Sequence, residues 1–143
     1  MTRNGEIALL VDTGVLLAAV SPRDKWHDRC AAFLLETDVP LMTTVAVLTE
    51  LFYFVHQDPM RTNLIWRFLS GGVVELASIE ARDLPEIEHL MQRYADRPMD
   101  FADATLVYVA GREGIADMLT IDHDDFETYR FGRNRRFRIS PAR

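Results

Sequence analysis

The sequence has little of what stabilises secreted proteins or anchors membrane proteins. Cys30 is the single cysteine among 143 residues, which excludes an internal disulfide framework and a zinc site made of cysteines. No apolar run reaches the roughly 18 residues that a membrane-spanning helix requires. The first segment, MTRNGEIALLVD, reaches Asp12 too early for a secretory signal. We therefore expect a cytoplasmic protein with no membrane contact.

Lysine is also scarce: Lys25 is the only one, so nearly all of the positive charge is arginine, and the 16 basic residues are outnumbered by 22 acidic ones. The formal net charge of −6 argues against a protein that binds nucleic acid through its overall charge. Arginine can bind a phosphate through two hydrogen bonds at once. Residues 130–143 are therefore either a solvated tail or a phosphate-binding segment, since they contain no acid and hold Arg130, Arg133, Arg135, Arg136, Arg138 and Arg143.

Length and composition fit one globular domain, residues 1–143, with 48% hydrophobic residues available for a core. Apolar runs typical of buried strands alternate with segments of helical spacing, and there is no repeat or linker. This alternation predicts an α/β sandwich around a parallel sheet. The predicted strands are residues 7–11, 40–44, 73–76, 117–121 and 136–140.

The predicted helices lie between these strands and carry start and stop signals. Asp58-Pro59 starts one helix and Gly71-Gly72 ends it, while Gly114 closes another. A further helix is expected to start at Ser21-Pro22. The other helical segments are residues 13–20, 45–56, 83–94 and 101–112.

Acidic residues lie where predicted strands end. Asp12 directly follows the first strand, and Asp122 directly follows the strand that ends at Ile121. Asp100 and Asp103 stand at the start of the helix that leads into that strand. Because ligand sites of parallel α/β sheets lie beyond the carboxyl ends of the strands, we expect these side chains to face one cleft.

Glu50 is the only charged residue between Thr43 and Val55, inside a helix whose composition predicts burial. An unpaired buried carboxylate costs several kcal/mol, so Glu50 needs a partner or a raised pKa. A cation shared with the acids at the strand ends would meet that need. The alternatives are a solvent-facing position or an ion pair with an arginine.

Each of the other acids also has a purely structural explanation. Asp12 could simply end a strand, since aspartate is common in turns. Asp100 and Asp103 could cap a helix, and Asp122 could form a turn or begin a one-turn helix. The argument for function rests on the set, because several carboxylates in one cleft repel one another unless a cation neutralises them.

Oxygen ligands favour a hard ion, Mg²⁺ or Mn²⁺. The histidines argue against zinc, because none has the spacing of a zinc motif; they are His27, His56, His89 and His123. A carboxylate cluster with such an ion suits phosphodiester hydrolysis. The ion lowers the pKa of an attacking water and shields the phosphate from the acids.

Four pieces in order, LLVDTGVLLA, TELFYFV, MDFADATLVYVA and MLTIDHDDF, resemble the PIN domain family over residues 7–140, and more narrowly the VapC toxins of bacterial type II toxin–antitoxin modules. The resemblance implies a three-layer α/β/α sandwich with a central parallel sheet of about five strands. It implies that Asp12, Glu50, Asp103 and Asp122 are the catalytic, metal-binding acids. Asp103 fits the family's Asp-Ala position better than Asp100, which becomes a cap or an auxiliary ligand, and Thr13 could orient a ligand.

The same resemblance implies a Mg²⁺- or Mn²⁺-dependent endoribonuclease that hydrolyses RNA with a metal-activated water. It further implies a cognate antitoxin laid over helix grooves, and a homodimer. The large apolar side chains of residues 47–55 and 63–69 suit either contact, or they pack in the core.

Three alternatives change the substrate or remove the chemistry: a PIN-like nuclease for RNA maturation, one for structured DNA, or an inactive PIN-like binding module. Other phosphate-handling α/β folds fit less well. A response-regulator receiver needs a late lysine near its site, which this chain lacks. A dehalogenase-like phosphatase needs an acid two residues after Asp12, where Gly14 stands, and a dinucleotide binder needs a glycine-rich turn there.

Overall fold

The computed structural model describes residues 8–143, and its centre is one parallel sheet of five strands in the order β3-β2-β1-β4-β5. The strands are β1 (Leu9–Val11), β2 (Leu41–Thr43), β3 (Val74–Leu76), β4 (Asp117–Leu119) and β5 (Arg138–Ser140). The expected α/β fold is therefore confirmed. Each strand is shorter than the apolar run that predicts it, and Ile7 lies outside the described residues.

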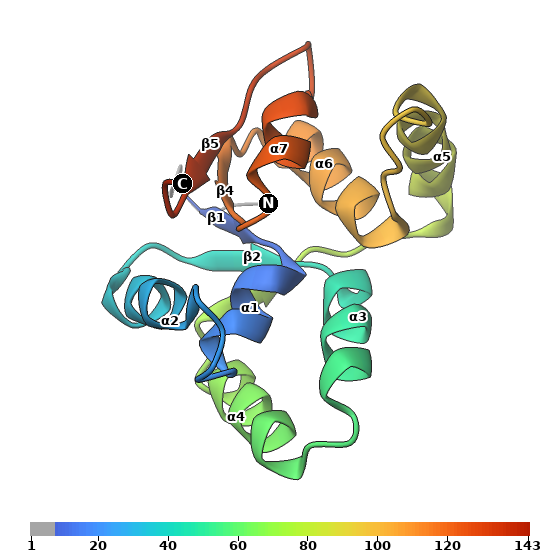
Figure 1. The fold of residues 1–143 in the computed structure, drawn as a ribbon. Coiled ribbons are helices and arrows are strands. Elements are labelled where there is room, and N and C mark those ends of the chain that lie inside the picture. Colours follow the sequence, from blue (N-terminus) through green and yellow to red (C-terminus); the bar gives the residue numbers. More distant parts are fainter. Residues whose placement is uncertain (1–7) are drawn as a thin grey trace.

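The helices form a layer on each side of the sheet (Figure 1). One layer contains α1 (Thr13–Ala19), α2 (His27–Glu36), α3 (Val45–Val55) and α4 (Pro59–Ser70). The other contains α5 (Leu84–Arg93), α6 (Phe101–Glu113) and α7 (His123–Thr128), and a short 3₁₀ turn, η2 (Ala81–Asp83), precedes α5. No helix within residues 8–143 is long and apolar enough to cross a membrane.

The strand order places a topological switch point between β1 and β4. The chain moves outward from β1 through β2 to β3, then returns to the other side of β1 and continues through β4 to β5. The connections that leave β1 and β4 therefore diverge, and they open a crevice at the carboxyl ends of these two strands.

α6 carries its first-turn acid into the interior because the helix is apolar almost all round. Asp103 is buried together with Leu106, Val109 and Ala110 of the same helix. The helix ends where expected, since its C-cap Gly114 has a φ of 70°, a conformation that glycine adopts without a steric penalty.

The start of α2 is a correction. Ser21-Pro22 was expected to open a helix, but α2 begins at His27. The carboxylate of Asp24 accepts a hydrogen bond of 2.7 Å from the backbone N–H of Trp26, and the N–H of Ser21 bonds back to Ala18. These local bonds hold residues 21–26 in turns, because a short aspartate side chain competes with helical hydrogen bonding.

The expectation that α3 is buried is also wrong. Val47, Leu51 and Val55 face the core, whereas Tyr53 and Phe54 are 69% and 52% exposed. α4 is similarly divided, with Ile65 buried and Trp66 mostly exposed. Core packing therefore explains one side of each helix, and the other side leaves large apolar side chains at the surface.

Candidate active site

One pocket of about 360 Å³ lies in the crevice at the switch point. Its lining includes every residue that the sequence offers as a candidate: Asp12, Thr13, Glu50, Asp100, Asp103 and Asp122. Asp12 comes from the end of β1 and Asp122 from the loop after β4, while Glu50 is on α3. The expected convergence of distant acids is therefore observed.

Asp12 is the most firmly held of these side chains. It caps α1, with one carboxylate oxygen accepting a bond of 2.8 Å from the N–H of Thr13. The other oxygen accepts a bond of 2.9 Å from the hydroxyl of Thr120. Burial raises the pKa of Asp12 to about 7, although both hydrogen bonds act in the opposite direction.

Thr120 is a site residue that the sequence analysis misses. Besides donating to Asp12, its hydroxyl oxygen accepts a bond of 2.9 Å from the backbone N–H of Asp122. One side chain thus fixes two of the acids relative to each other. The signal in the sequence is the spacing Thr120-Ile121-Asp122 at a strand end, where a threonine hydroxyl commonly bonds a backbone N–H two residues on.

Asp100 and Asp103 lie at the start of α6, and both line the pocket. The carboxylate of Asp100 caps α6 by accepting a bond of 2.8 Å from the N–H of Asp103, and it also lines the pocket. The pKa of Asp103 is raised to about 9, chiefly by burial and also by the charges of Asp12, Asp100, Asp122 and Glu50. The capping device and the acidic site are therefore one structure.

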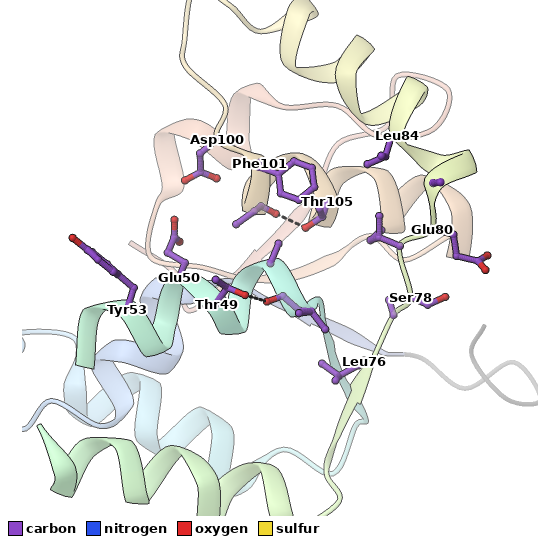
Figure 2. Close-up of a pocket in the computed structure, with 16 residues that line it drawn as sticks. Thr49, Glu50, Tyr53, Leu76, Ser78, Glu80, Leu84, Asp100, Phe101 and Thr105 are labelled. Atoms are coloured by element: carbon purple, nitrogen blue, oxygen red, sulfur yellow. Dashed lines mark hydrogen bonds between the residues drawn. The ribbon is translucent and has the colours of Figure 1, made fainter. Parts of the chain in front are cut away.

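Glu50 is half-buried on α3 and points across the gap toward Asp100 on α6 (Figure 2). Burial raises the pKa of Glu50, the charge of Asp100 adds to the shift, and the nearby Thr13 hydroxyl opposes it. Glu50 has no ion pair with any residue in the range 8–143. An arginine partner therefore does not explain its position among apolar neighbours.

Asp122 is more exposed than Asp12 or Asp103. It lies at the N-cap position of α7, three residues after β4 ends, but its side chain makes no capping hydrogen bond. Partial burial raises the pKa of Asp122 to about 6, and Asp125 adds to the shift. Asp124, two residues further along the chain, pairs with Arg143 and does not line the pocket.

The comparison with protein families identifies the family to which this fold belongs. A model of the PIN domain family matches residues 9–132. The chain belongs to the PIN domain family. It is similar to Ribonuclease VapC26 of Mycobacterium tuberculosis, with 27% identity over 135 residues, which are 93% of this chain and 100% of VapC26.

Two solved structures share the fold of this PIN domain. The first is VapC20 of Mycobacterium tuberculosis, described as a sarcin-ricin loop cleaving toxin, with a TM-score of 0.70 and 21% identity over 82% of this chain and 93% of VapC20. The second is VapBC2 of Rickettsia felis bound to a DNA fragment from their promoter, with a TM-score of 0.65 and 15% identity over 93% of this chain and 98% of the matched chain. The expected resemblance to VapC proteins is confirmed.

The donors in the pocket of this PIN domain suit a hard divalent cation. They are carboxylate oxygens together with the hydroxyl of Thr13, which is buried and makes no hydrogen bond of standard geometry with any residue from 8 to 143. In the described part of the chain, no three His, Cys, Asp or Glu side chains stand close enough to hold an ion without moving. Binding would therefore require the carboxylates to rotate toward one another, which their mutual repulsion opposes unless a cation is shared.

A larger apolar groove of about 1120 Å³ adjoins the acidic pocket and shares Glu50 and Asp100 with it (Figure 2). It lies between α3, the start of α6, and the segment that joins β3 to α5. Tyr53, Phe101 and Leu76 line it and are each at least partly exposed. The acids of the PIN domain therefore lie at the edge of an open apolar surface.

Proposed function

We propose that this protein is a Mg²⁺- or Mn²⁺-dependent endoribonuclease and the toxin of a VapBC-type toxin–antitoxin module. The observation that carries the proposal is the convergence of Asp12, Glu50, Asp103 and Asp122 in one pocket at the switch point. Because each of them has a raised pKa, the pocket favours neutralisation by protons or by a cation. The similarity to Ribonuclease VapC26 supports RNA as the substrate.

Asp12, Asp103 and Asp122 are the proposed ligands of the ion, and Glu50 completes the set. Thr13 and Asp100 are auxiliary, since both line the same pocket. When bound, the ion supplies positive charge that stabilises the phosphate in the transition state and lowers the pKa of an attacking water. Thr120 keeps Asp12 in its position and fixes the backbone at Asp122 throughout.

Hydrolysis proceeds without a protein nucleophile. Water adds to the phosphorus in line with the 3′ oxygen, the bond between phosphorus and that oxygen breaks, and the oxygen takes a proton. The products therefore carry a 5′-phosphate and a 3′-hydroxyl. Mapping the ends of cleaved RNA checks this part of the proposal directly.

The decisive experiment measures cleavage of RNA by the purified protein with Mg²⁺, with EDTA, and for Asp12→Asn. We expect cleavage only by the unsubstituted protein with Mg²⁺. Asp124→Asn is the matched control, because it removes the same charge from a residue that pairs with Arg143 outside the pocket. Equal cleavage under all conditions would contradict the nuclease assignment, and failure to bind Mn²⁺ would favour an inactive binding module.

The toxin role requires a partner, and the exposed apolar side chains offer the surfaces. A cavity of about 220 Å³ between α1, α2 and α4 is lined by Leu34, Leu64 and Phe68, and suits the apolar face of an antitoxin segment. Tyr53 and Val45, exposed on α3, suit a homodimer contact. Expression alone should arrest bacterial growth, and co-expression with a small neighbouring gene product should restore growth and yield a complex. Normal growth during expression of active enzyme would favour a role in RNA maturation or DNA cleavage.

A further inference from the structure

The arginines of residues 130–143 fall into two groups. The first group stabilises the fold. The guanidinium of Arg130 donates to three backbone carbonyls at the end of α7. Arg138 pairs with Asp117 at 2.9 Å, and Arg143 pairs with Glu127 at 3.0 Å. These side chains already have acceptors, so they are not available to an incoming phosphate without breaking an existing contact.

The second group lies on residues 131–136, which we name the arginine turn. Phe131 and Arg135 form an antiparallel bridge, with N–H···O distances of 3.0 and 2.9 Å. Between them Gly132 and Asn134 have positive φ values of 54° and 62°, which make the turn tight. Arg133, Arg135 and Arg136 are exposed, and none of the three has an ion pair with any residue from 8 to 143.

The arginine turn is fixed on the body of the protein. The ring of Phe131 is buried, with its centre 4.7 Å from that of Phe137, and the guanidinium of Arg135 lies 4.9 Å above the Phe131 ring. The backbones of Gly111 on α6 and Gly132 meet so closely that a Cβ on Gly111 would lie 3.1 Å from the nitrogen of Gly132. A ligand therefore meets a preformed cationic surface, which reduces the entropy lost on binding.

A cavity of about 360 Å³ between α5 and α6 borders the turn at Phe131 and Gly132. Gly132 lines it together with His89 and Arg93, and Glu86 is the carboxylate residue among its lining side chains. Arg93 is exposed and has no ion pair in the described chain. The region thus gathers positive charge in a protein whose formal net charge is −6.

We propose that the arginine turn, together with Arg93, binds the phosphate backbone of RNA outside the catalytic pocket. The inference rests on the proposed function. The charged side chains of residues 8–143 that line the catalytic pocket are all carboxylates, which repel a polyanion. The phosphates that flank the cleaved bond therefore need cationic contacts elsewhere, and arginine provides them through paired hydrogen bonds. Asp103 and Gly111 are on the same helix, about 12 Å apart along its axis at 1.5 Å per residue. An RNA must therefore extend beyond the pocket by at least this distance to reach the turn.

The test measures binding of a labelled single-stranded RNA in EDTA, so that no cleavage occurs, over a series of salt concentrations. Arg133→Gln combined with Arg136→Gln should weaken binding by roughly tenfold or more, and should reduce the slope of log K against log salt by about 1.4, or 0.7 for each lost phosphate contact. The matched control is Arg23→Gln combined with Arg67→Gln. It removes the same charge from exposed arginines on other elements that also have no ion pair in residues 8–143.

The loss of affinity in the Arg133→Gln and Arg136→Gln double variant should increase with RNA length. It should be absent for an RNA too short to reach from the pocket to the turn. Equal weakening by the two double variants, or no RNA binding by the unsubstituted protein, would overturn the inference. The inference would also be overturned if the variant with Arg133→Gln and Arg136→Gln kept its affinity for RNA but lost binding to an acidic protein partner. Cleavage of the same RNA with Mg²⁺ tests the proposed function separately, since binding without cleavage would retain the arginine turn and reject the nuclease.

Discussion

The two ends of α6 differ in the sign of the charge that they leave unpaired. At its start, Asp100 and Asp103 face further carboxylates, and no cationic side chain from residues 8–143 lines the pocket. Toward its end, Gly111 supports a turn that holds three exposed arginines and no acid. Elsewhere many charges are paired, as in Arg61 with Asp58 and Arg97 with Asp125.

This difference indicates where ligands of opposite sign belong. Like charges in one place cost free energy, and where no side chain of opposite charge lies beside them, a ligand can offset that cost. The acidic end fits a divalent cation and the basic end fits a phosphate backbone. The following variants test whether the two ends act as separate sites.

The largest effect is expected at the acidic end. Asp103→Asn should reduce metal-dependent RNA cleavage by roughly a hundredfold or more, because even the outer-shell partners of a metal ligand contribute 10–100-fold. The same change should raise the melting temperature of the metal-free protein at pH 8, since it removes a buried carboxylate whose pKa is about 9. Cleavage assays and thermal unfolding in EDTA measure the two effects, and loss of both activity and stability would indicate misfolding instead.

Thr120→Val should weaken Mn²⁺ binding by about 10–100-fold without unfolding the protein, because it removes the donor to Asp12 and the acceptor for Asp122 while keeping the side-chain shape. Calorimetric titration measures the affinity. Thr120→Ser should restore it, since serine retains the hydroxyl. Thr128→Val, on an exposed threonine of α7, is the control, and an equal loss in both variants would contradict a specific role for Thr120.

The stability of the metal-free protein should fall as pH rises. Asp12 and Asp103 have pKa values of about 7 and 9 in the folded state, above the ordinary value of 3.8. At pH values above 3.8 and below the raised pKa of each acid, the folded state binds more protons than the unfolded state. The free energy of unfolding therefore decreases as pH rises through this range. Melting temperatures from pH 5 to 8.5 in EDTA should decline, less steeply for Asp103→Asn, and excess Mg²⁺ should reduce the decline. A flat profile would contradict the burial of these acids as carboxylates.

The smallest effect is expected where an arginine already has a partner. Arg138→Gln breaks an exposed ion pair with Asp117, and such pairs contribute little to stability. The melting temperature should fall slightly, and RNA affinity should change less than for Arg133→Gln combined with Arg136→Gln. The RNA-binding titration compares Arg138→Gln with the double variant. An equal loss of affinity would show that an existing ion pair does not keep an arginine from binding RNA.

The acids of the site could be predicted because their positions follow from local patterns. A polar residue after an apolar run marks a strand end, and the parallel sheet brings such ends together at a single edge. The bond from Thr120 to Asp12 could not be predicted this way, since the two residues are 108 positions apart in the sequence. The role of each arginine likewise depended on which acid the fold placed beside it.

Periodicity failed for α3 because its residues are apolar on every side, so the pattern does not distinguish Leu51, which is buried, from Tyr53, which is not. It failed at the start of α2 because Asp24 forms local hydrogen bonds that compete with a helix. One error concerns which side chains of a helix are exposed, and the other concerns where a helix begins. A few local contacts decide both, and the hydrophobic periodicity averaged over the segment does not show them.

The strand order divides the acids evenly between two parts of the chain. Asp12 and Glu50 precede β3, on the part that builds β1, β2 and β3, whereas Asp103 and Asp122 belong to the part that crosses back and builds β4 and β5. A cation bound by both pairs of acids would cross-link the two parts of the chain. Its release would weaken the pairing of β1 with β4 before any other part of the sheet. The resistance of the molecule to unfolding would therefore increase with metal occupancy.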